Sequence, residues 1–195
     1  MKNREDTYYN RAKKAGYRSR AAYKLIEIDR KFEILSRAHY ILEIGSSPGG
    51  WTDVLMERNP EYLLCVDISA KKSDIMPFSI RGDVTKESSW NDIRNYLDGR
   101  KMDLILSDAM SHTTGQHSLD HASSVDICTS IVKYGMDVLR IGGNMMVKQF
   151  QGEYTKEFMN QFSGFFRRNY ITKPMASRSE SSEIYIIFAG LLDHT

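Results

Sequence analysis

Glycine and aspartate residues follow three predicted strands, and their spacing favours a nucleoside-binding site. Segment 42–51 reads Leu-Glu-Ile-Gly-Ser-Ser-Pro-Gly-Gly-Trp, a glycine-rich turn of the kind where doubly wound folds hold a nucleotide. Asp67 ends the next strand, about 20 residues beyond Gly45, where a carboxylate can accept hydrogen bonds from a ribose diol. Asp83 follows a third strand and could accept a hydrogen bond from an adenine amino group.

The turn departs from the dinucleotide fingerprint at its middle position. Gly45 and Gly50 fit G-x-G-x-x-G, but Ser47 stands where the backbone must approach a pyrophosphate. This argues against NAD or FAD and favours a nucleoside without a pyrophosphate. Each feature alone also fits a plain strand-to-helix turn or a helix cap. Together, at successive strand ends, they predict S-adenosylmethionine as the cofactor.

Three chargeable residues should meet at the same edge of the predicted sheet. Asp108 follows a fourth strand, and Lys148 stands near the end of a fifth, apolar one. The link before the last strand is too short for a parallel crossover, so that strand should run antiparallel and deliver Glu183 to this edge. A lysine in an apolar central strand is costly unless it is paired or functional.

The elements that must position these residues alternate along the chain. Ser19 can cap a helix that carries Lys24 beside an apolar stripe, and further helices are predicted at 118–140 and 155–168. A serine-rich loop at 176–182 should lie beside a site. Strands are predicted at 40–44, 62–67, 79–82, 102–107, 144–150, 170–173 and 183–190. The pattern predicts an α/β, Rossmann-like fold: a mostly parallel seven-stranded sheet with an antiparallel last strand and helices on both faces.

Composition predicts one domain over residues 1–195 in a reducing, cytoplasmic setting. The chain has 41% hydrophobic residues, two cysteines inside apolar stretches, and no signal peptide or apolar run of membrane-spanning length. Net charge is only +2, but residues 1–37 hold 11 Lys or Arg against 5 Asp or Glu. We expect residues 1–18 to form a basic tail whose tyrosines and cations contact RNA; a solvated helix and tail is the alternative.

Five ordered motifs between about 17 and 190 resemble the RrmJ/FtsJ family of ribose 2′-O-methyltransferases. They are Arg-Ser-Arg-Ala-Ala-Tyr-Lys-Leu from 18, Gly-Ser-Ser-Pro-Gly-Gly-Trp from 45, Ser-Asp from 107, Val-Lys-Gln-Phe-Gln-Gly from 147 and Ser-Arg-Ser-Glu-Ser-Ser-Glu-Ile-Tyr-Ile from 177. The resemblance implies a class I S-adenosylmethionine-dependent fold and a Lys-Asp-Lys-Glu catalytic tetrad. The family usually continues its Ser-Asp with Met-Ala-Pro-Asn, whereas 109–112 reads Ala-Met-Ser-His, which bears on substrate positioning.

Carried over residue by residue, the resemblance assigns two sets of site residues. The tetrad is Lys24, Asp108, Lys148 and Glu183. The cofactor contacts are Gly49, Trp51, Asp67, Asp83 and Asp108, with Gly50 in the same turn. The resemblance also implies action on a uridine ribose in large-subunit ribosomal RNA, and a monomer is expected by default. A transfer-RNA methyltransferase, a noncatalytic RNA-binding protein, and a methyltransferase for small molecules or proteins are the alternatives.

Lys148 is the principal candidate for the chemistry. A ribose hydroxyl is a poor nucleophile at neutral pH, so methyl transfer needs in-line placement and help with the departing proton. A neutral Lys148 would accept that proton, a state favoured by burial and by the Lys24 cation. A charged Lys148 would instead hold the hydroxyl oxygen and stabilise developing negative charge.

We expect no metal site. Methyl transfer from a sulfonium needs no metal, and the histidines show no ligand spacing. His117 and His121 stand four residues apart but lack the intervening acidic residue of a zinc-protease helix. Surface or helix-capping positions are expected for them instead.

Overall fold

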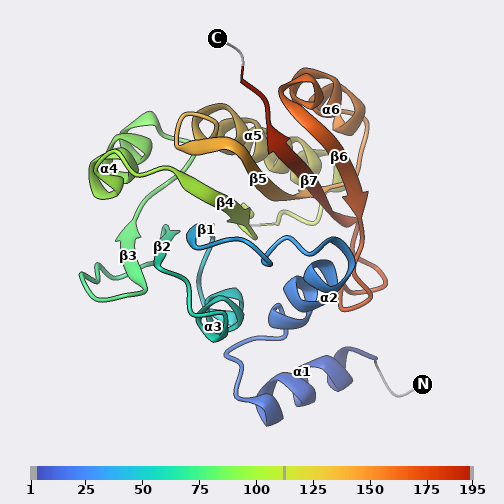
Figure 1. Ribbon diagram of the computed structural model, residues 1–195. Coiled ribbons are helices and arrows are strands. Elements are labelled where there is room, and N and C mark those ends of the chain that lie inside the picture. Colours follow the sequence, from blue (N-terminus) through green and yellow to red (C-terminus); the bar gives the residue numbers. More distant parts are fainter. Residues whose placement is uncertain (1–3, 112, 194–195) are drawn as a thin grey trace.

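The fold is built on a central sheet of seven strands in the order β3-β2-β1-β4-β5-β7-β6 (Figure 1). The computed structural model describes residues 4–111 and 113–193. β1 to β5 run parallel, and β7 runs antiparallel to both β5 and β6. The strands are β1 Tyr40–Ile44, β2 Tyr62–Asp67, β3 Phe78–Arg81, β4 Met102–Ser107, β5 Leu139–Phe150, β6 Phe166–Thr172 and β7 Glu183–Leu191. The predicted sheet, including its antiparallel last strand, is confirmed.

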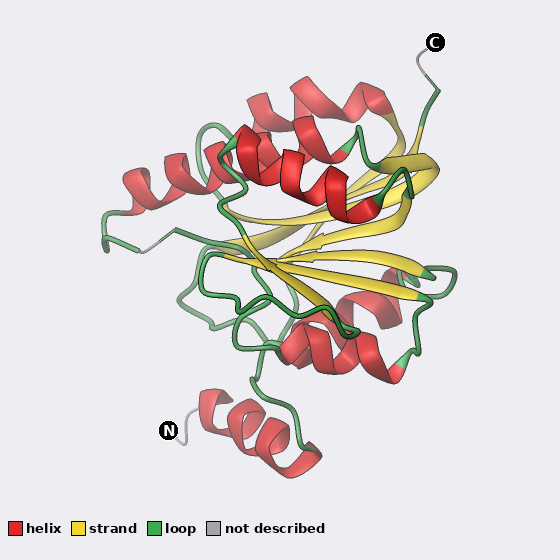
Figure 2. Cartoon of the chain, turned by 90° about the vertical axis from the view of Figure 1, so that its left-hand side faces the viewer, coloured by secondary structure: helices red, strands yellow, loops and turns green. Residues whose placement is uncertain are grey.

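Helices cover both faces of the sheet, as predicted (Figures 1 and 2). The helices are α1 Arg4–Ala15, α2 Ala22–Phe32, α3 Gly50–Glu57, α4 Glu87–Leu97, α5 His117–Gly135 and α6 Thr155–Phe162, with the 3₁₀ turn η1 Ser163–Phe165. α4, α5 and α6 pack on one face, where Trp90 and Phe158 are buried against strand residues. α2 and α3 cover the other face through residues such as Leu25 and Trp51. Runs of Leu, Ile and Val make the central strands apolar on both sides, which suits a sheet covered twice.

Residues 4–15 form helix α1, where the sequence suggested a tail. α1 packs on the outside of α2, away from the sheet (Figure 1). Ala12 is buried in the contact, and the Tyr8 hydroxyl donates a hydrogen bond to Glu27 Oε1 at 2.8 Å. Helix α2 starts later than predicted. It begins at Ala22 rather than after a Ser19 cap, and it ends at Phe32 because Glu33 adopts a left-handed conformation with φ of 53°.

The predicted helix over 118–140 is too long, and the strand after it is longer than predicted. α5 ends at Gly135, and β5 already begins at Leu139. Met102 of β4 pairs with Leu139 and Leu104 pairs with Asn144, so the extra residues of β5 form a bulge. Gly142 lies in that bulge with φ of +76°. Gly142 therefore belongs to a bulge in β5, and the last residues of the predicted helix are part of that strand.

The predicted helix over 155–168 also ends early. α6 ends at Phe162, and β6 begins at Phe166 rather than at 170. Phe166 pairs with Leu191 of β7, and its ring lies 5.0 Å from that of Phe188. Pairing and core packing thus override the helical pattern of this segment. None of the helices within the described residues is long and apolar enough to cross a bilayer.

Candidate functional site

A cavity of about 670 Å³ opens at the carboxyl edge of the parallel strands. Its volume is in the range of small-molecule and cofactor sites. Predicted residues Asp67, Asp83, Asp108 and Lys148 all line it. The rest of the described lining comes from residues next to the strand ends: Ile44, Gly45, Ser47, Val66, Ile68, Ser69, Gly82, Val84, Thr85, Ala109, Met110 and Ser111, with Ile127 from α5. Of these, Gly45 and Ser47 belong to the predicted glycine turn and Ala109, Met110 and Ser111 to the segment after Asp108, whereas Ile127 of α5 was not expected at the site.

The two carboxylates predicted to hold a nucleoside are fixed by local hydrogen bonds. Asp67 Oδ2 accepts from the Ser47 backbone N–H at 3.0 Å, and its Oδ1 accepts from the backbone and hydroxyl of Ser69. Asp83 Oδ1 accepts from the Thr85 hydroxyl at 2.6 Å and from the Thr85 backbone N–H at 3.0 Å. The Thr85 hydroxyl bond holds the pKa of Asp83 below its usual range, although burial opposes it. Asp83 is therefore a charged acceptor at neutral pH.

Only the first part of the glycine turn, Gly45 and Ser47, belongs to the described lining of the cavity. Gly49, Gly50 and Trp51 are absent from the described lining of the cavity. A Cβ on Gly49 would lie 2.2 Å from Arg18 Cζ, and one on Gly50 would lie 2.1 Å from Ser19 Oγ. Trp51 is buried and donates its indole N–H to the Ala21 carbonyl at 2.9 Å. These residues pack against the segment that leads into α2.

The four tetrad residues converge from α2, β4, β5 and β7 as two ion pairs. Lys148 Nζ lies 3.0 Å from Asp108 Oδ1 and donates a hydrogen bond of 2.5 Å to the Asp108 carbonyl. Lys24 Nζ lies 2.6 Å from Glu183 Oε1. The second contact is close but poorly aligned, since Glu183 Oε1 has no hydrogen bond of normal geometry. The juxtaposition predicted from strand topology is thus present.

Sequence reasoning missed Tyr185, which touches the tetrad. Tyr185 pairs with Lys148 across β5 and β7, and its hydroxyl donates to Asp108 Oδ1 at 2.8 Å. It stands two residues after Glu183, so the two-residue period of a strand places both on one face. Burial raises the pKa of Tyr185 well above its usual value, and the Asp108 charge adds to this, so the hydroxyl stays a donor.

Charge and burial compete at Asp108. Burial raises the pKa of its carboxyl, but the charges of Lys148 and Lys24 and the hydrogen bonds from Lys148 and Tyr185 outweigh it. The net effect is a pKa below the usual value. Asp108 is therefore a carboxylate that faces two cations.

The serine-rich loop predicted at 176–182 does lie beside the tetrad and is held by α2 and by the segment just before it. The Ala176 backbone N–H donates to Glu27 Oε2 at 3.1 Å, and its carbonyl accepts from Arg20 Nη2 at 2.8 Å. The structure describes only part of segment 109–112, which differs from the usual family sequence. Ala109, Met110 and Ser111 line the cavity, whereas His112 lies outside the described residues.

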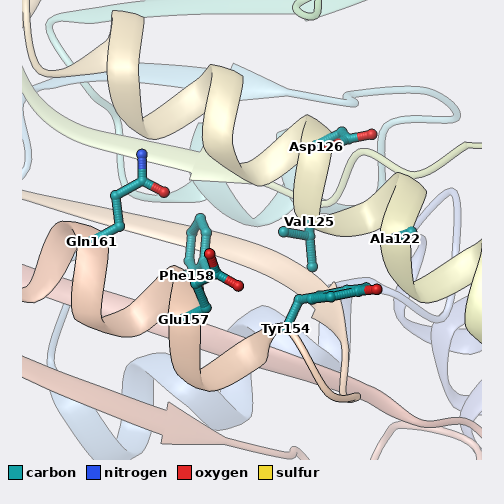
Figure 3. A pocket seen from close by; sticks show the side chains of 7 residues that line it. All are labelled: Ala122, Val125, Asp126, Tyr154, Glu157, Phe158 and Gln161. Carbon is teal, nitrogen blue, oxygen red and sulfur yellow. The ribbon is translucent and has the colours of Figure 1, made fainter.

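A second, smaller groove of about 290 Å³ lies between α5 and α6 (Figure 3). It is lined by Ala122, Val125, Asp126, Tyr154, Glu157, Phe158 and Gln161. It contains none of the predicted site residues. Over residues 4–111 and 113–193, there is no group of three or more His, Cys, Asp or Glu side chains that could hold a metal ion.

Comparison with known families identifies the fold and its activity class. The model of the FtsJ-like methyltransferase family matches residues 17–191. This chain belongs to that family. Among curated relatives of this FtsJ-like methyltransferase, the protein named Ribosomal RNA large subunit methyltransferase E of Picrophilus torridus is 44% identical over 195 residues, 95% of this chain and 97% of that protein. The protein of the same name from Anaplasma marginale is 41% identical, over 90% of this chain and 89% of that protein.

A solved structure supports the same family and fold. A crystal structure described as a ribosomal RNA methyltransferase from Plasmodium falciparum is 33% identical to this FtsJ-like methyltransferase. The superposition has a TM-score of 0.78 and covers 91% of this chain and all of that chain. The predicted resemblance to the RrmJ/FtsJ family is thus confirmed.

Proposed function

We propose that this methyltransferase transfers the methyl group of S-adenosylmethionine to the 2′-hydroxyl of a uridine ribose in large-subunit ribosomal RNA. The observation that carries the proposal is the pair of ion pairs, Lys148 with Asp108 and Lys24 with Glu183, beside a nucleoside-sized cavity. The names of the relatives give the substrate class.

The cavity has the chemistry that the cofactor requires. Asp67 and Asp83 present carboxylates at neighbouring strand ends, suited to a ribose diol and an adenine amino group. Ile68, Val84 and Ile127 give the cavity an apolar wall, which suits the flat adenine base of the cofactor. The bound cofactor would supply an electrophilic methyl group on a sulfonium. Asp67 and Asp83 would hold its nucleoside, and the turn containing Gly49, Gly50 and Trp51 would shape one end of the site.

The tetrad would orient the ribose hydroxyl, and the proton that the hydroxyl loses on methylation would pass to water, or to Lys148 where its amine is neutral. Lys148 is only 6% exposed, and it directs N–H donors at two oxygens of Asp108. A further N–H of its ammonium could donate to the acceptor hydroxyl oxygen and stabilise the charge that develops there. Lys24 and Glu183 would bind the ribose at the rim of the cavity. Orientation therefore contributes more than proton abstraction in this proposal.

The remaining expectations about the protein's surroundings are also part of the proposal. We expect it to act as a monomer in the cytoplasm, where its two buried free cysteines stay reduced. RNA would contact the basic N-terminal segment, in which Arg11, Lys13 and Lys14 belong to α1.

A transfer assay with labelled S-adenosylmethionine tests the proposal. Unmethylated large ribosomal subunits, free ribosomal RNA and transfer RNA would be compared, with Lys148→Ala as the test variant. Lys156→Ala is the matched control, since Lys156 is exposed on α6. We expect label at one ribose of large-subunit RNA, a rate at least about a hundredfold lower for Lys148→Ala, and an unchanged rate for Lys156→Ala.

The other outcomes separate the alternatives. Label only in transfer RNA would keep the chemistry and replace the substrate. Cofactor binding without transfer to any RNA would favour another acceptor or a noncatalytic RNA-binding role. Retention of full activity by Lys148→Ala would contradict the tetrad.

A further inference from the structure

His121 is buried on the first turns of α5 and uses both ring nitrogens. It is 2% exposed, so the predicted surface position is wrong for this histidine. Its Nδ1 lies 2.6 Å from the carbonyl oxygen of Phe150, and its Nε2 accepts the backbone N–H of Tyr154 at 3.0 Å. These contacts select the tautomer with hydrogen on Nδ1, since a carbonyl needs a donor and an N–H needs an acceptor.

The same turn of α5 forms hydrogen bonds with both the carbonyl and the N–H of Phe150. The Phe150 N–H donates to Ser124 Oγ at 3.0 Å, and Ser124 Oγ in turn donates to the His121 carbonyl at 2.7 Å. His121 and Ser124 thus form a clamp on the last residue of β5. A strand end normally frays, and this clamp fixes it to a helix.

The clamped residue lies where two tetrad side chains enter the site. Lys148 is two residues before Phe150 on β5, and Phe150 pairs with Glu183 at the start of β7. One residue further, the Gln151 N–H donates to the Ser182 carbonyl at 2.9 Å. Any shift of the β5 end therefore moves the backbone that carries Lys148 and Glu183.

The loop after β5 is shaped around the imidazole. A Cβ on Gly152 would lie 2.5 Å from His121 ring atoms, so only glycine lets the chain pass here. The Tyr154 ring stacks on the imidazole with centroids 5.5 Å apart and an angle of 4°. On its other side, Tyr154 lines the groove beneath Ala122 (Figure 3). The histidine is therefore enclosed by backbone and ring and is specifically oriented.

We propose that His121 is a positioning residue for methyl transfer, which locks the junction of β5 and β7 so that Lys148 and Glu183 face the acceptor hydroxyl together. It acts through backbone hydrogen bonds and does not touch the reacting atoms. The proposal rests on the proposed function for its kinetic consequence, but its structural consequence stands independently.

The test variant is His121→Phe, which keeps an aromatic ring for stacking and removes both hydrogen bonds. His117→Phe is the control, because His117 is exposed one turn earlier on α5. We expect kcat to fall about ten- to a hundredfold in His121→Phe, with little change in cofactor Kd, since misplacement by about 1 Å can cost a hundredfold. His121→Asn, which can restore a donor near the Nδ1 position, should recover part of kcat.

Backbone hydrogen exchange gives a readout that needs no substrate. The amides of Phe150 and Gln151 should exchange at least tenfold faster in His121→Phe than in the wild type or His117→Phe, while amides in β1 stay protected. Unchanged exchange at these amides would overturn the clamp. Faster exchange with an unchanged kcat would overturn the positioning role. If the wild type transfers no methyl to ribosomal substrates, the proposed function fails, and the exchange data still decide the clamp.

Discussion

Asp108 is the residue on which most of the site's interactions meet. Its Oδ1 forms an ion pair with Lys148 and accepts a hydrogen bond from the Tyr185 hydroxyl. Its backbone carbonyl accepts a second hydrogen bond from Lys148. A buried carboxylate is costly unless it is paired and hydrogen-bonded, and here both conditions hold. The lowered pKa of Asp108 is the net result of burial and these partners.

Tyr185→Phe should therefore shift the pH dependence of methyl transfer. Without the hydroxyl, the pKa of Asp108 rises toward its ordinary value, so the acidic limb of the kcat profile should move to higher pH. The lost bond to a charged group should also lower the free energy of unfolding by about 2 kcal/mol. A kcat profile extended down to about pH 3, because the pKa of Asp108 lies below 3.8, measures this, with Tyr170→Phe on the half-exposed strand β6 as control. An acidic limb that does not move would contradict the role of Tyr185.

A second buried carboxyl, Glu43 at the heart of β1, should control stability rather than chemistry. Burial raises its pKa from 4.5 to about 7, although hydrogen bonds from Thr52 and Cys65 oppose the shift. Since the folded-state pKa lies above the unfolded one, Glu43 favours folding most below pH 4.5. That contribution disappears as pH rises to about 7.

Glu43→Gln should flatten this dependence. Between pH 5 and 8, the unfolding free energy of the wild type should fall by about 3 kcal/mol more than that of the variant. Denaturant unfolding at both pH values measures the difference. Glu180→Gln, at an exposed position, should behave as the wild type does. Parallel curves for Glu43→Gln and the wild type would show that Glu43 is ionised throughout.

At the residue scale, sequence reasoning succeeded where strand ends fix positions. Asp108, Lys148 and Glu183 were expected together because parallel strands share an edge and the last strand reverses. Tyr185 and His121 were not found, because their roles depend on hydrogen bonds to partners distant in sequence, at positions 108, 150 and 154. Alternation along a strand could have indicated Tyr185, but nothing local indicates the partners of a buried histidine.

At the scale of elements, the turn between β1 and α3 must pass close to the end of β4. Gly45 has φ of +75°, and a Cβ there would lie 2.5 Å from the Ala109 backbone nitrogen. Ala109 directly follows Asp108, so this close approach constrains the backbone that carries Asp108. Glycine is needed both for the conformation and for the space.

Gly45→Ala and Gly99→Ala together separate these two requirements. Gly99 has a similar φ of +79°, but a Cβ there would meet nothing within 4 Å. Gly99→Ala should cost about 1 kcal/mol from backbone strain alone. Gly45→Ala should cost about 2 kcal/mol more and abolish methyl transfer, because the Ala109 backbone must shift. Thermal unfolding and activity assays measure both effects, and equal costs would show that the turn has room to relax.

Element boundaries were predicted well for buried strands and poorly where pairing decides them. The predicted bounds of β1, β2 and β4 matched the observed ones, because each strand is a short apolar run between polar turns. The starts of β5 and β6 were missed, since the bulge at Gly142 and the edge strand at Phe166 exist only through their partner strands. The glycine turn was recognised, but its packing against Arg18 and Ser19 depends on a segment about 30 residues away in the chain.

At the scale of the whole molecule, helix α1 lies before the part of the chain that the family model matches. The family model begins at residue 17, and α1 precedes it. α1 is docked on α2, where the Arg11 guanidinium lies 4.6 Å from the Tyr23 ring centroid. The Glu27 carboxylate accepts a hydrogen bond from the Tyr8 hydroxyl of α1. It also accepts one from the Ala176 backbone N–H, in the loop that leads to Glu183. The helix is therefore oriented relative to the tetrad, and we expect its exposed lysines to contact RNA at a fixed distance from it.

Replacing Lys13 and Lys14 by alanine should weaken RNA binding without changing the chemistry. Each cation that neutralises a phosphate adds about 0.7 to 0.9 to the slope of log affinity against log salt, so the slope should fall by about 1.5 in the double variant. KM for RNA should rise while kcat stays within about twofold, because both lysines are exposed and lie outside the tetrad. Lys133→Ala with Lys156→Ala, exposed on α5 and α6, removes the same charge elsewhere. An equal loss of slope in that control would mean that net charge, rather than the placement of α1, attracts the RNA.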